Sequence, residues 1–234
     1  MGHFCHTHVR RLVASACAVI LAATLLTTTP ALLGSPALSP TAQAASCPAV
    51  EVVFARGREE PAGTGIVGTA FVNALRAKSR ANIGYYPVDY DAEISVDQGA
   101  KDMSSHIQYM AANCPQTRLV LGGYSLGATV TDMVLATPGP FFGFSNPLPL
   151  GSDSHIAAVV FFGNGARKVL GYPVSEFLPT YTNKIIDLCN AQDPVCSPSL
   201  DVKSFPTNWG DHLQAGYIDS GLVNQAATFA AAKL

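Results

Sequence analysis

The sequence is poor in charged residues, and those it has are not grouped by sign. Asp, Glu, Lys and Arg make up 13% of the 234 residues, with 14 basic and 16 acidic side chains and a formal net charge of −2. No stretch gathers Lys and Arg into the basic stripe that contact with phosphate groups requires. We therefore expect no nucleic-acid partner, and the composition suits a compact enzyme.

Histidines and closely spaced cysteine pairs are also scarce. Half of the six histidines lie with Cys5 among the first eight residues, in a spacing that resembles a metal-binding cluster. Because this segment is predicted to be removed, we do not expect it to bind a metal in the mature protein. No C-x-x-C spacing supports a zinc site. We expect neither a metal nor a cofactor, and the histidines left as candidates for chemistry are His106, His155 and His212.

Residues 1–44 have the pattern of a secretory signal peptide. Two arginines precede an apolar segment at 12–26, and small residues at 42–44 form a cleavage signal. The apolar segment is too short for a convincing membrane span, although an uncleaved anchor is the alternative. We expect the mature protein to begin near Ala45 and to be secreted, either released or retained at the cell surface or envelope.

Four cysteines remain after this removal, and an even number in an exported chain argues for two disulfides. Three connectivities are possible. We favour Cys189 with Cys196, because they are close in sequence and flank a turn, which leaves Cys47 with Cys114. In the chain-entropy model, closing the longer loop stabilises the fold by about 3 to 5 kcal/mol.

Residues 45–234 are predicted to form a single α/β domain. Strands and helices alternate without internal repeats, which predicts a three-layer sandwich around a mostly parallel sheet. The interval between Ser125 and Asp193, two residues considered below, is too short for a large lid domain. The predicted strands are 50–54, 85–88, 119–121, 156–162 and 184–188, and the predicted helices are 67–80, 97–113, 128–136 and 222–232.

The functional prediction depends on the segment between the strand at 119–121 and the helix at 128–136. Gly123-Tyr124-Ser125-Leu126-Gly127 matches G-x-S-x-G, in which a serine occupies a tight strand-to-helix turn. The two glycines remove side chains that would block the approach of strand and helix. We predict that Ser125 is a nucleophile and that the Leu126 N–H binds an oxyanion.

A serine nucleophile needs a base to take its proton, and the base needs an orienting carboxylate. In α/β-hydrolases the chain order is nucleophile, acid and then histidine. His106 precedes Ser125, and His155 follows it closely with few acids between them. His212 is therefore the predicted base.

Five acidic residues lie between the last two histidines: Glu176, Asp187, Asp193, Asp201 and Asp211. Asp193 lies in the short loop that the predicted disulfide closes, where its carboxylate has little conformational freedom. Asp187 falls within a predicted strand, and Asp211 is adjacent to the base. Asp193 is the predicted triad acid, and the alternative is a turn residue before proline.

Two loops carry further predictions. The loop at 55–65 follows the first strand, at the edge where an open α/β sheet places its ligands, so the Arg58 N–H is the predicted second oxyanion donor rather than part of a simple turn. The loop at 137–151 contains three phenylalanines. It is expected to line an acyl-binding groove, to touch lipid, or only to pack over the core.

Four stretches occur in order along the chain: Phe54-Ala55-Arg56-Gly57, Gly122-Gly123-Tyr124-Ser125-x-Gly127, the Cys189–Cys196 loop with Asp193-Pro194-Val195, and His212-Leu213. Together they resemble the cutinase family of secreted serine esterases, especially its bacterial cutinase-like branch. The resemblance covers nearly all of residues 45–234. It implies a lidless α/β-hydrolase, ester hydrolysis by a triad of Ser125, Asp193 and His212, and the disulfides Cys47–Cys114 and Cys189–Cys196.

The chain departs from fungal cutinases at two positions. Leu126 stands where they carry glutamine, and Arg58 stands where they carry a hydroxyl residue. Both backbone N–H donors survive these changes, whereas side-chain contributions to the oxyanion hole are lost or altered. The resemblance therefore implies simple ester hydrolysis more strongly than attack on polymeric cutin.

We predict a secreted, monomeric serine esterase that hydrolyses esters of short- to medium-chain fatty acids through an acyl-enzyme, on small-molecule or lipid substrates. Two alternatives remain within hydrolases: an interfacial lipase or phospholipase A, and a cutinase-type polyester hydrolase. The third alternative is a weakly catalytic, surface-exposed binding module.

Overall fold

The computed structural model describes residues 47–201, 203 and 205–234. The predicted signal peptide at 1–44 and the histidines and cysteines within it lie outside the described residues. In the described part of the chain, no helix is both long and apolar enough to cross a membrane.

Five parallel strands form one sheet in the order β2-β1-β3-β4-β5. All of β4 and all of β3 except its first residue are buried, which explains why their sequences are continuous apolar runs. Because the strands are parallel, the loops that follow them meet at one edge of the sheet. The strands are β1 (Val50–Ala55), β2 (Ile83–Pro87), β3 (Arg118–Tyr124), β4 (Ile156–Phe162) and β5 (Ile185–Leu188).

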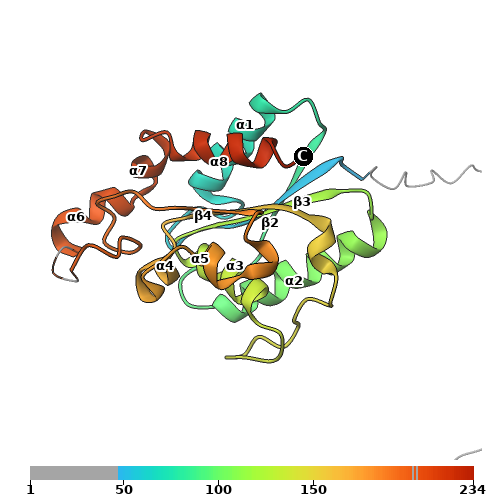
Figure 1. Cartoon of the computed structure of the whole chain (residues 1–234), viewed down its shortest axis with the longest axis horizontal. Helices are drawn as coiled ribbons and strands as arrows, with labels where there is room; N and C mark the ends of the chain where they lie inside the picture. The colour runs from blue at the N-terminus through green and yellow to red at the C-terminus, as the bar shows by residue number, and fades with distance from the viewer. Residues whose placement is uncertain (1–46, 202, 204) are drawn as a thin grey trace, which may run out of the picture. The chain divides into compact units, whose positions relative to one another are not determined.

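Helices cover both faces of the sheet (Figure 1). Successive side chains of β1 point to opposite faces, so Val52 and Phe54 pack in the core under α1 and α8, whereas Val53 packs in the core under α2 and α3. A separate layer of buried apolar side chains therefore lies between each face of the sheet and the helices that cover it. The long helices are α1 (Gly65–Lys78), α2 (Val96–Asn113), α3 (Leu126–Ala136) and α8 (Leu222–Ala231).

The predicted α/β-hydrolase sandwich is confirmed, and every predicted strand and helix is present with its ends shifted by up to three residues. Sequence analysis missed four helices of eight residues or fewer, which are too short to show a periodic pattern. They are α4 (Gly165–Leu170), α5 (Val174–Phe177), α6 (Phe205–His212) and α7 (Gln214–Ile218), and two 3-10 turns, η1 (Ser152–His155) and η2 (Pro179–Tyr181), accompany them.

Both favoured disulfides are present. Cys47 is bonded to Cys114 with their Cα atoms 5.6 Å apart, and Cys189 is bonded to Cys196 with their Cα atoms 5.7 Å apart. The first ties the residues before β1 to the residues before β3, and the second closes the loop after β5. The acid predicted for the triad therefore lies in a covalently closed loop.

The loop at 137–151 is not part of the catalytic cavity. None of its residues lines the cavity that contains Ser125, so the loop forms no wall of an acyl-binding groove at this serine. Phe144 is fully buried in the core, whereas Phe141 and Phe142 are exposed. The loop therefore packs over the core through one phenylalanine, and its contact with lipid stays a prediction.

Candidate active site

The turn between β3 and α3 places Ser125 above the edge of the sheet. Its φ of 54° and ψ of −117° lie in a region that residues other than glycine rarely adopt. Its N–H donates to the Phe162 carbonyl at 2.9 Å, which ties the turn to β4. A side chain at Gly123 would collide with the Gly127 carbonyl, and one at Gly127 would collide with the Ala55 carbonyl. The close approach of strand and helix thus requires both glycines, as predicted.

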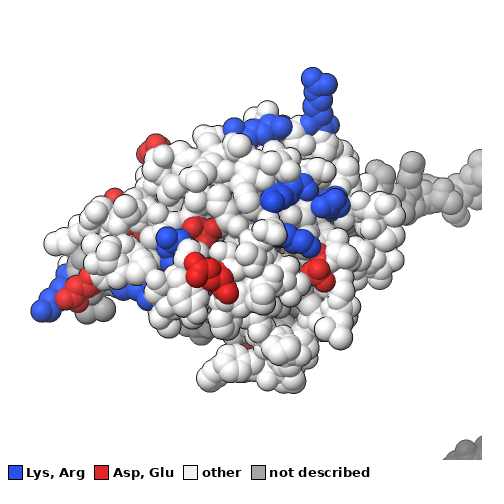
Figure 2. Space-filling view, in the orientation of Figure 1, with Lys and Arg blue, Asp and Glu red and all other residues white. Residues whose placement is uncertain are grey.

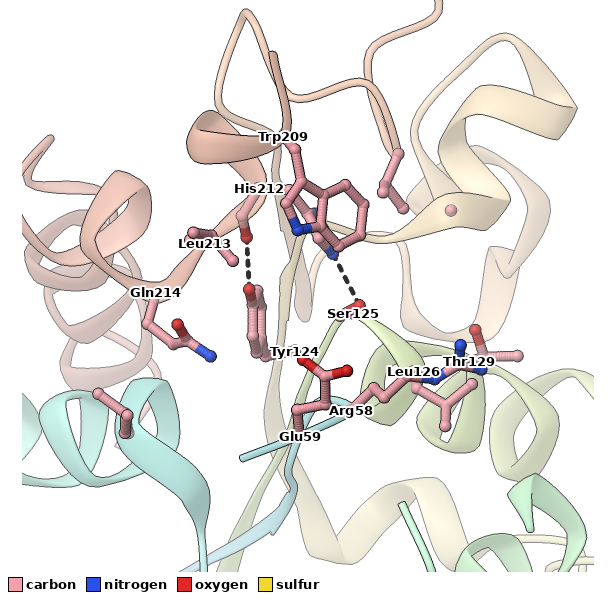
Figure 3. Close-up of a pocket in the computed structure, with 13 residues that line it drawn as sticks. Arg58, Glu59, Tyr124, Ser125, Leu126, Thr129, Trp209, His212, Leu213 and Gln214 are labelled. Carbon is pink, nitrogen blue, oxygen red and sulfur yellow. Dashed lines mark hydrogen bonds between the residues drawn. The ribbon is translucent and has the colours of Figure 1, made fainter. Parts of the chain in front are cut away.

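The structure brings the three predicted triad residues into one line of hydrogen bonds. Figure 3 shows the first of these, between Ser125 and His212. Ser125 Oγ lies 2.8 Å from His212 Nε2, and His212 Nδ1 lies 2.7 Å from Asp193 Oδ2. The side chains of His212 and Asp193 are buried, so water cannot compete for the contact between them. This geometry lets one ring nitrogen accept the serine proton while the other donates to the carboxylate.

The Asp193 carboxylate is held by its own loop. Its Oδ1 accepts the Val195 N–H at 2.7 Å, and the Asp193 N–H donates to the Asn190 carbonyl at 2.9 Å. The Asn190 amide donates in turn to the Asp211 carbonyl at 3.2 Å, next to His212 in the chain. The disulfide-closed loop and the segment that carries the histidine are therefore joined, which limits the relative motion of acid and base.

A cavity of about 570 Å³ opens above Ser125, and both predicted oxyanion donors line it. Leu126 is the first residue of α3, where N–H groups have no acceptor within the helix. Arg58 belongs to the loop after β1. In Figure 3, Arg58 and Leu126 lie on the side of Ser125 away from His212, where a donor to the developing oxyanion must be. Their role in binding the oxyanion stays a prediction.

A family model described as Cutinase matches residues 46–234. This chain belongs to the cutinase family. The resemblance inferred from the motifs is thereby confirmed.

Two relatives of this cutinase-family chain come from Mycobacterium tuberculosis (strain ATCC 25618 / H37Rv). One, named probable carboxylesterase Culp2, is 54% identical over 228 residues and covers 96% of both chains. The other, named phospholipase Culp4, is 46% identical over 228 residues, which is 96% of this chain and 92% of the relative. The names place both relatives among ester hydrolases of different substrate classes.

Solved structures show the same fold. The Trichoderma reesei cutinase in complex with a C11Y4 phosphonate inhibitor is 26% identical with a TM-score of 0.59, covering 79% of this chain and 75% of that one. The catalytic core domain of acetyl xylan esterase from Trichoderma reesei is 24% identical with a TM-score of 0.61, covering 81% of this chain and all of that one. The second likeness concerns the fold alone.

Two tyrosines support the triad in this family member, and sequence analysis missed both. Tyr217 is fully buried on α7, and its hydroxyl donates to Asp193 Oδ2, the oxygen that faces His212. The Tyr124 hydroxyl donates to the His212 carbonyl (Figure 3). Burial and the Asp193 carboxylate raise the pKa of Tyr217, so its hydroxyl remains a proton donor. No spacing rule connects either tyrosine to the triad, so the sequence carried no signal for them.

Glu60 is a further support that sequence analysis missed. Its Oε2 accepts the Gly57 N–H at 2.7 Å, and its Oε1 accepts the N–H groups of Ile66 and Val67 at 2.8 Å and 3.0 Å. The carboxylate thus joins the beginning of α1 to the turn that presents Arg58. Burial raises the pKa of Glu60, while these three N–H groups favour its charged form.

We expect Glu60→Gln to lower kcat by about 10- to 100-fold with little change in KM. A glutamine amide has one acceptor oxygen for N–H groups on two sides, so the turn with Arg58 would shift. The Arg58 N–H is proposed to bind the oxyanion, whose charge develops only in the transition state. Its displacement should therefore lower kcat and leave substrate binding, and with it KM, nearly unchanged. Steady-state kinetics with p-nitrophenyl butyrate measures both constants. Glu176→Gln, on the exposed side of α5, should leave them unchanged, and an unaltered kcat in Glu60→Gln would contradict the role.

A second buried acid, Asp132, lies two turns after Ser125 on α3. Both its carboxyl oxygens are buried without a hydrogen-bond partner among the described residues. Burial raises the pKa of Asp132 to about 8. The Asn164 amide favours the charged form, whereas Asp187, which pairs with Arg167 at 3.8 Å, opposes it. Asp132 is therefore protonated at neutral pH, and its role is not in the triad.

Asp132→Asn is expected to stabilise the protein at neutral and mildly alkaline pH but not in acid. The ordinary pKa of 3.8 applies in the unfolded chain, so between about pH 4 and pH 8 only the folded state binds the proton. The wild type therefore loses stability as the pH rises through this window, and asparagine removes that loss. The gain in free energy of unfolding should reach on the order of 4 kcal/mol near pH 7. Urea unfolding at several pH values measures it, and a gain independent of pH would contradict the assignment.

Proposed function

We propose that this protein is a secreted serine carboxylesterase that hydrolyses esters of short- to medium-chain fatty acids. The observation that carries the proposal is the continuous line of hydrogen bonds from Ser125 through His212 to Asp193, at the wall of an open cavity. Membership of the cutinase family and the name of the relative Culp2, probable carboxylesterase, support ester hydrolysis.

The proposed reaction has two halves. In the first, His212 takes the Ser125 proton, Oγ attacks the ester carbonyl carbon, and the N–H groups of Arg58 and Leu126 bind the oxyanion. The tetrahedral intermediate collapses, and His212 returns the proton to the leaving alcohol. In the second half, His212 takes a proton from water as the water oxygen attacks the acyl carbon. The second tetrahedral intermediate then collapses, His212 returns the proton to Ser125 Oγ, and the carboxylic acid leaves. Asp193 orients His212 and stabilises its charged form throughout.

Hydrolysis of a p-nitrophenyl ester series from acetyl to palmitoyl tests this function, together with labelling of Ser125 by a fluorophosphonate. We expect turnover that is highest for short or medium chains, and covalent labelling of Ser125. If no ester is hydrolysed and Ser125 is not labelled, the esterase proposal is refuted and the binding-module alternative is favoured.

Interfacial phospholipase activity is the second candidate. The relative named phospholipase Culp4 supports it, as do strongly exposed apolar side chains at Ile94, Phe142 and Leu150. Figure 2 shows a face with large uncharged areas between small groups of charged side chains. Release of fatty acid from phosphatidylcholine vesicles, with a rate that jumps above the solubility limit of a short-chain substrate, would favour this activity over simple ester hydrolysis.

We also propose that the protein is exported and acts as a monomer outside the cytosol, free or at the cell envelope. The two disulfides, which persist in oxidising compartments, support export. Mass spectrometry of protein from the culture medium and from the envelope fraction would locate it. An N-terminus near Ala45 is expected, and an intact N-terminus in the cytosol would contradict export.

A further inference from the structure

A second cavity, of about 470 Å³, lies beside the catalytic one, and no step of the proposed mechanism uses it. It is bounded by α3 on one side and by α4 and α5 on the other. Apart from Thr129 and Asp132, its walls are apolar or glycine. The apolar lining consists of Ala136, Ala166, Val169, Leu170, Val174 and Phe177.

The second cavity adjoins the nucleophile. Thr129 and Gly165 line both cavities. Thr129 follows Ser125 by one turn of α3, and Gly165 begins α4 just after the end of β4. The boundary between the two cavities is therefore formed by the small side chain of Thr129 and by Gly165, which has no side chain. The two cavities border each other next to Ser125.

The lining suits an uncharged hydrocarbon chain. Apolar walls favour a group that gains free energy by leaving water, whereas a charged group would lose its hydration without finding a partner. The Asp132 carboxyl in the wall is neutral below about pH 8, because burial raises its pKa to that value.

The position of His212 indicates which part of an ester enters. The leaving alcohol must take its proton from His212 Nε2, so it lies along the wall that His212 shares with Trp209 and Leu213. Figure 3 shows Thr129 on the other side of Ser125 from Leu213. The acyl group, directed away from the alcohol, therefore extends toward Thr129 and the second cavity.

We propose that the second cavity binds the aliphatic acyl chain of the ester while its carbonyl carbon is attached to Ser125 Oγ. The inference rests on the proposed esterase function and assigns its chain-length selectivity to a place in the fold. Each methylene that enters should raise kcat/KM by up to about fourfold, until the chain fills the cavity. Selectivity should therefore respond to changes in α4 that leave the triad intact.

The test compares p-nitrophenyl acetate, butyrate, hexanoate and octanoate in wild type and Ala166→Phe. Ala166 lines the second cavity but not the first, so a phenyl group there should fill the acyl site alone. We expect the hexanoate-to-acetate ratio of kcat/KM to fall by at least about tenfold, with acetate changed by less than about twofold. Ala77→Phe, on the exposed side of α1, is the matched control and should leave the ratio unchanged.

A second variant covers the case in which Ala166→Phe fails to fold. Val169 lines the second cavity and is 87% exposed, so Val169→Asp should fold while placing a charge in an apolar wall of the proposed acyl site. It should lower the same ratio. An unchanged ratio in correctly folded Val169→Asp and Ala166→Phe would overturn the proposal.

A parallel series of acetate esters of straight-chain alcohols separates the acyl from the alcohol side. Ala166→Phe should leave this series unchanged. A loss confined to the alcohol series would overturn the assignment, as would a wild type that shows no gain with acyl length. A wild type that hydrolyses no ester and is not labelled at Ser125 would refute the esterase function itself, and the inference with it.

Discussion

Changing Ser125 to alanine is expected to lower kcat/KM for p-nitrophenyl butyrate by at least about 10⁴-fold. Alanine removes the Oγ that attacks the carbonyl, so no acyl-enzyme can form. What remains is the cavity with its backbone N–H groups, which can assist the attack of water only weakly. Steady-state kinetics gives the loss, and the same variant should no longer react with a fluorophosphonate.

Ser154→Ala provides the matched control. Ser154 is an exposed residue of η1 whose hydroxyl donates to the Gly151 carbonyl at 2.7 Å, outside the catalytic cavity. It should keep full activity and label normally at Ser125. Activity of Ser125→Ala within about tenfold of wild type, in protein with an unchanged thermal transition, would show that another group is the nucleophile.

Asp193→Asn is expected to lower kcat by about 10⁴-fold near neutral pH, with a much smaller change in KM. The carboxylate holds the Nδ1–H tautomer, which leaves Nε2 free to accept the serine proton. An asparagine amide can turn its NH₂ toward His212 and favour the opposite tautomer, and it cannot stabilise the imidazolium. The Tyr217 hydroxyl, which donates to the same carboxylate oxygen, reinforces the wild-type arrangement.

Asp211→Asn separates the triad acid from a general effect of lost charge. Asp211 is adjacent to His212 in the chain, and its Oδ1 contacts the Asn190 amide at 3.4 Å rather than the imidazole. We expect its replacement to change kcat by less than about threefold. Equal losses in Asp193→Asn and Asp211→Asn would contradict the assignment of Asp193 as the orienting acid.

The parts of the site that sequence analysis identified have local signals. The turn at Ser125 needs glycine on both sides because the backbones of β3, β1 and α3 approach closely there. The G-x-S-x-G motif contains both glycines within five consecutive residues, so it can be recognised in the sequence. Asp193 was found through the short disulfide loop around it. His212 was found by chain order, because few histidines were available.

The support around the triad had no comparable signal. Tyr217 looks like any residue of a short helix, yet folding places its hydroxyl on Asp193. Glu60 sits in a charged loop, and its three N–H partners include two from the following helix. The aromatic content of the loop at 137–151 left several interpretations open, and only the structure shows that Phe144 packs in the core while the loop lines no part of the cavity at Ser125.

By itself the sequence determined the α/β class and the nucleophile turn, because these depend on periodicity and a short motif. It also predicted the favoured disulfide pairing and the choice of base and acid, because these depend on spacing and order along the chain. Only the tertiary structure decided which buried groups contact the triad residues, that both carboxyl oxygens of Asp132 are buried without a hydrogen bond to the described residues, and that a second apolar cavity adjoins Ser125. Those features depend on distances and burial between segments far apart in sequence, and these are fixed only when the helices pack on the sheet.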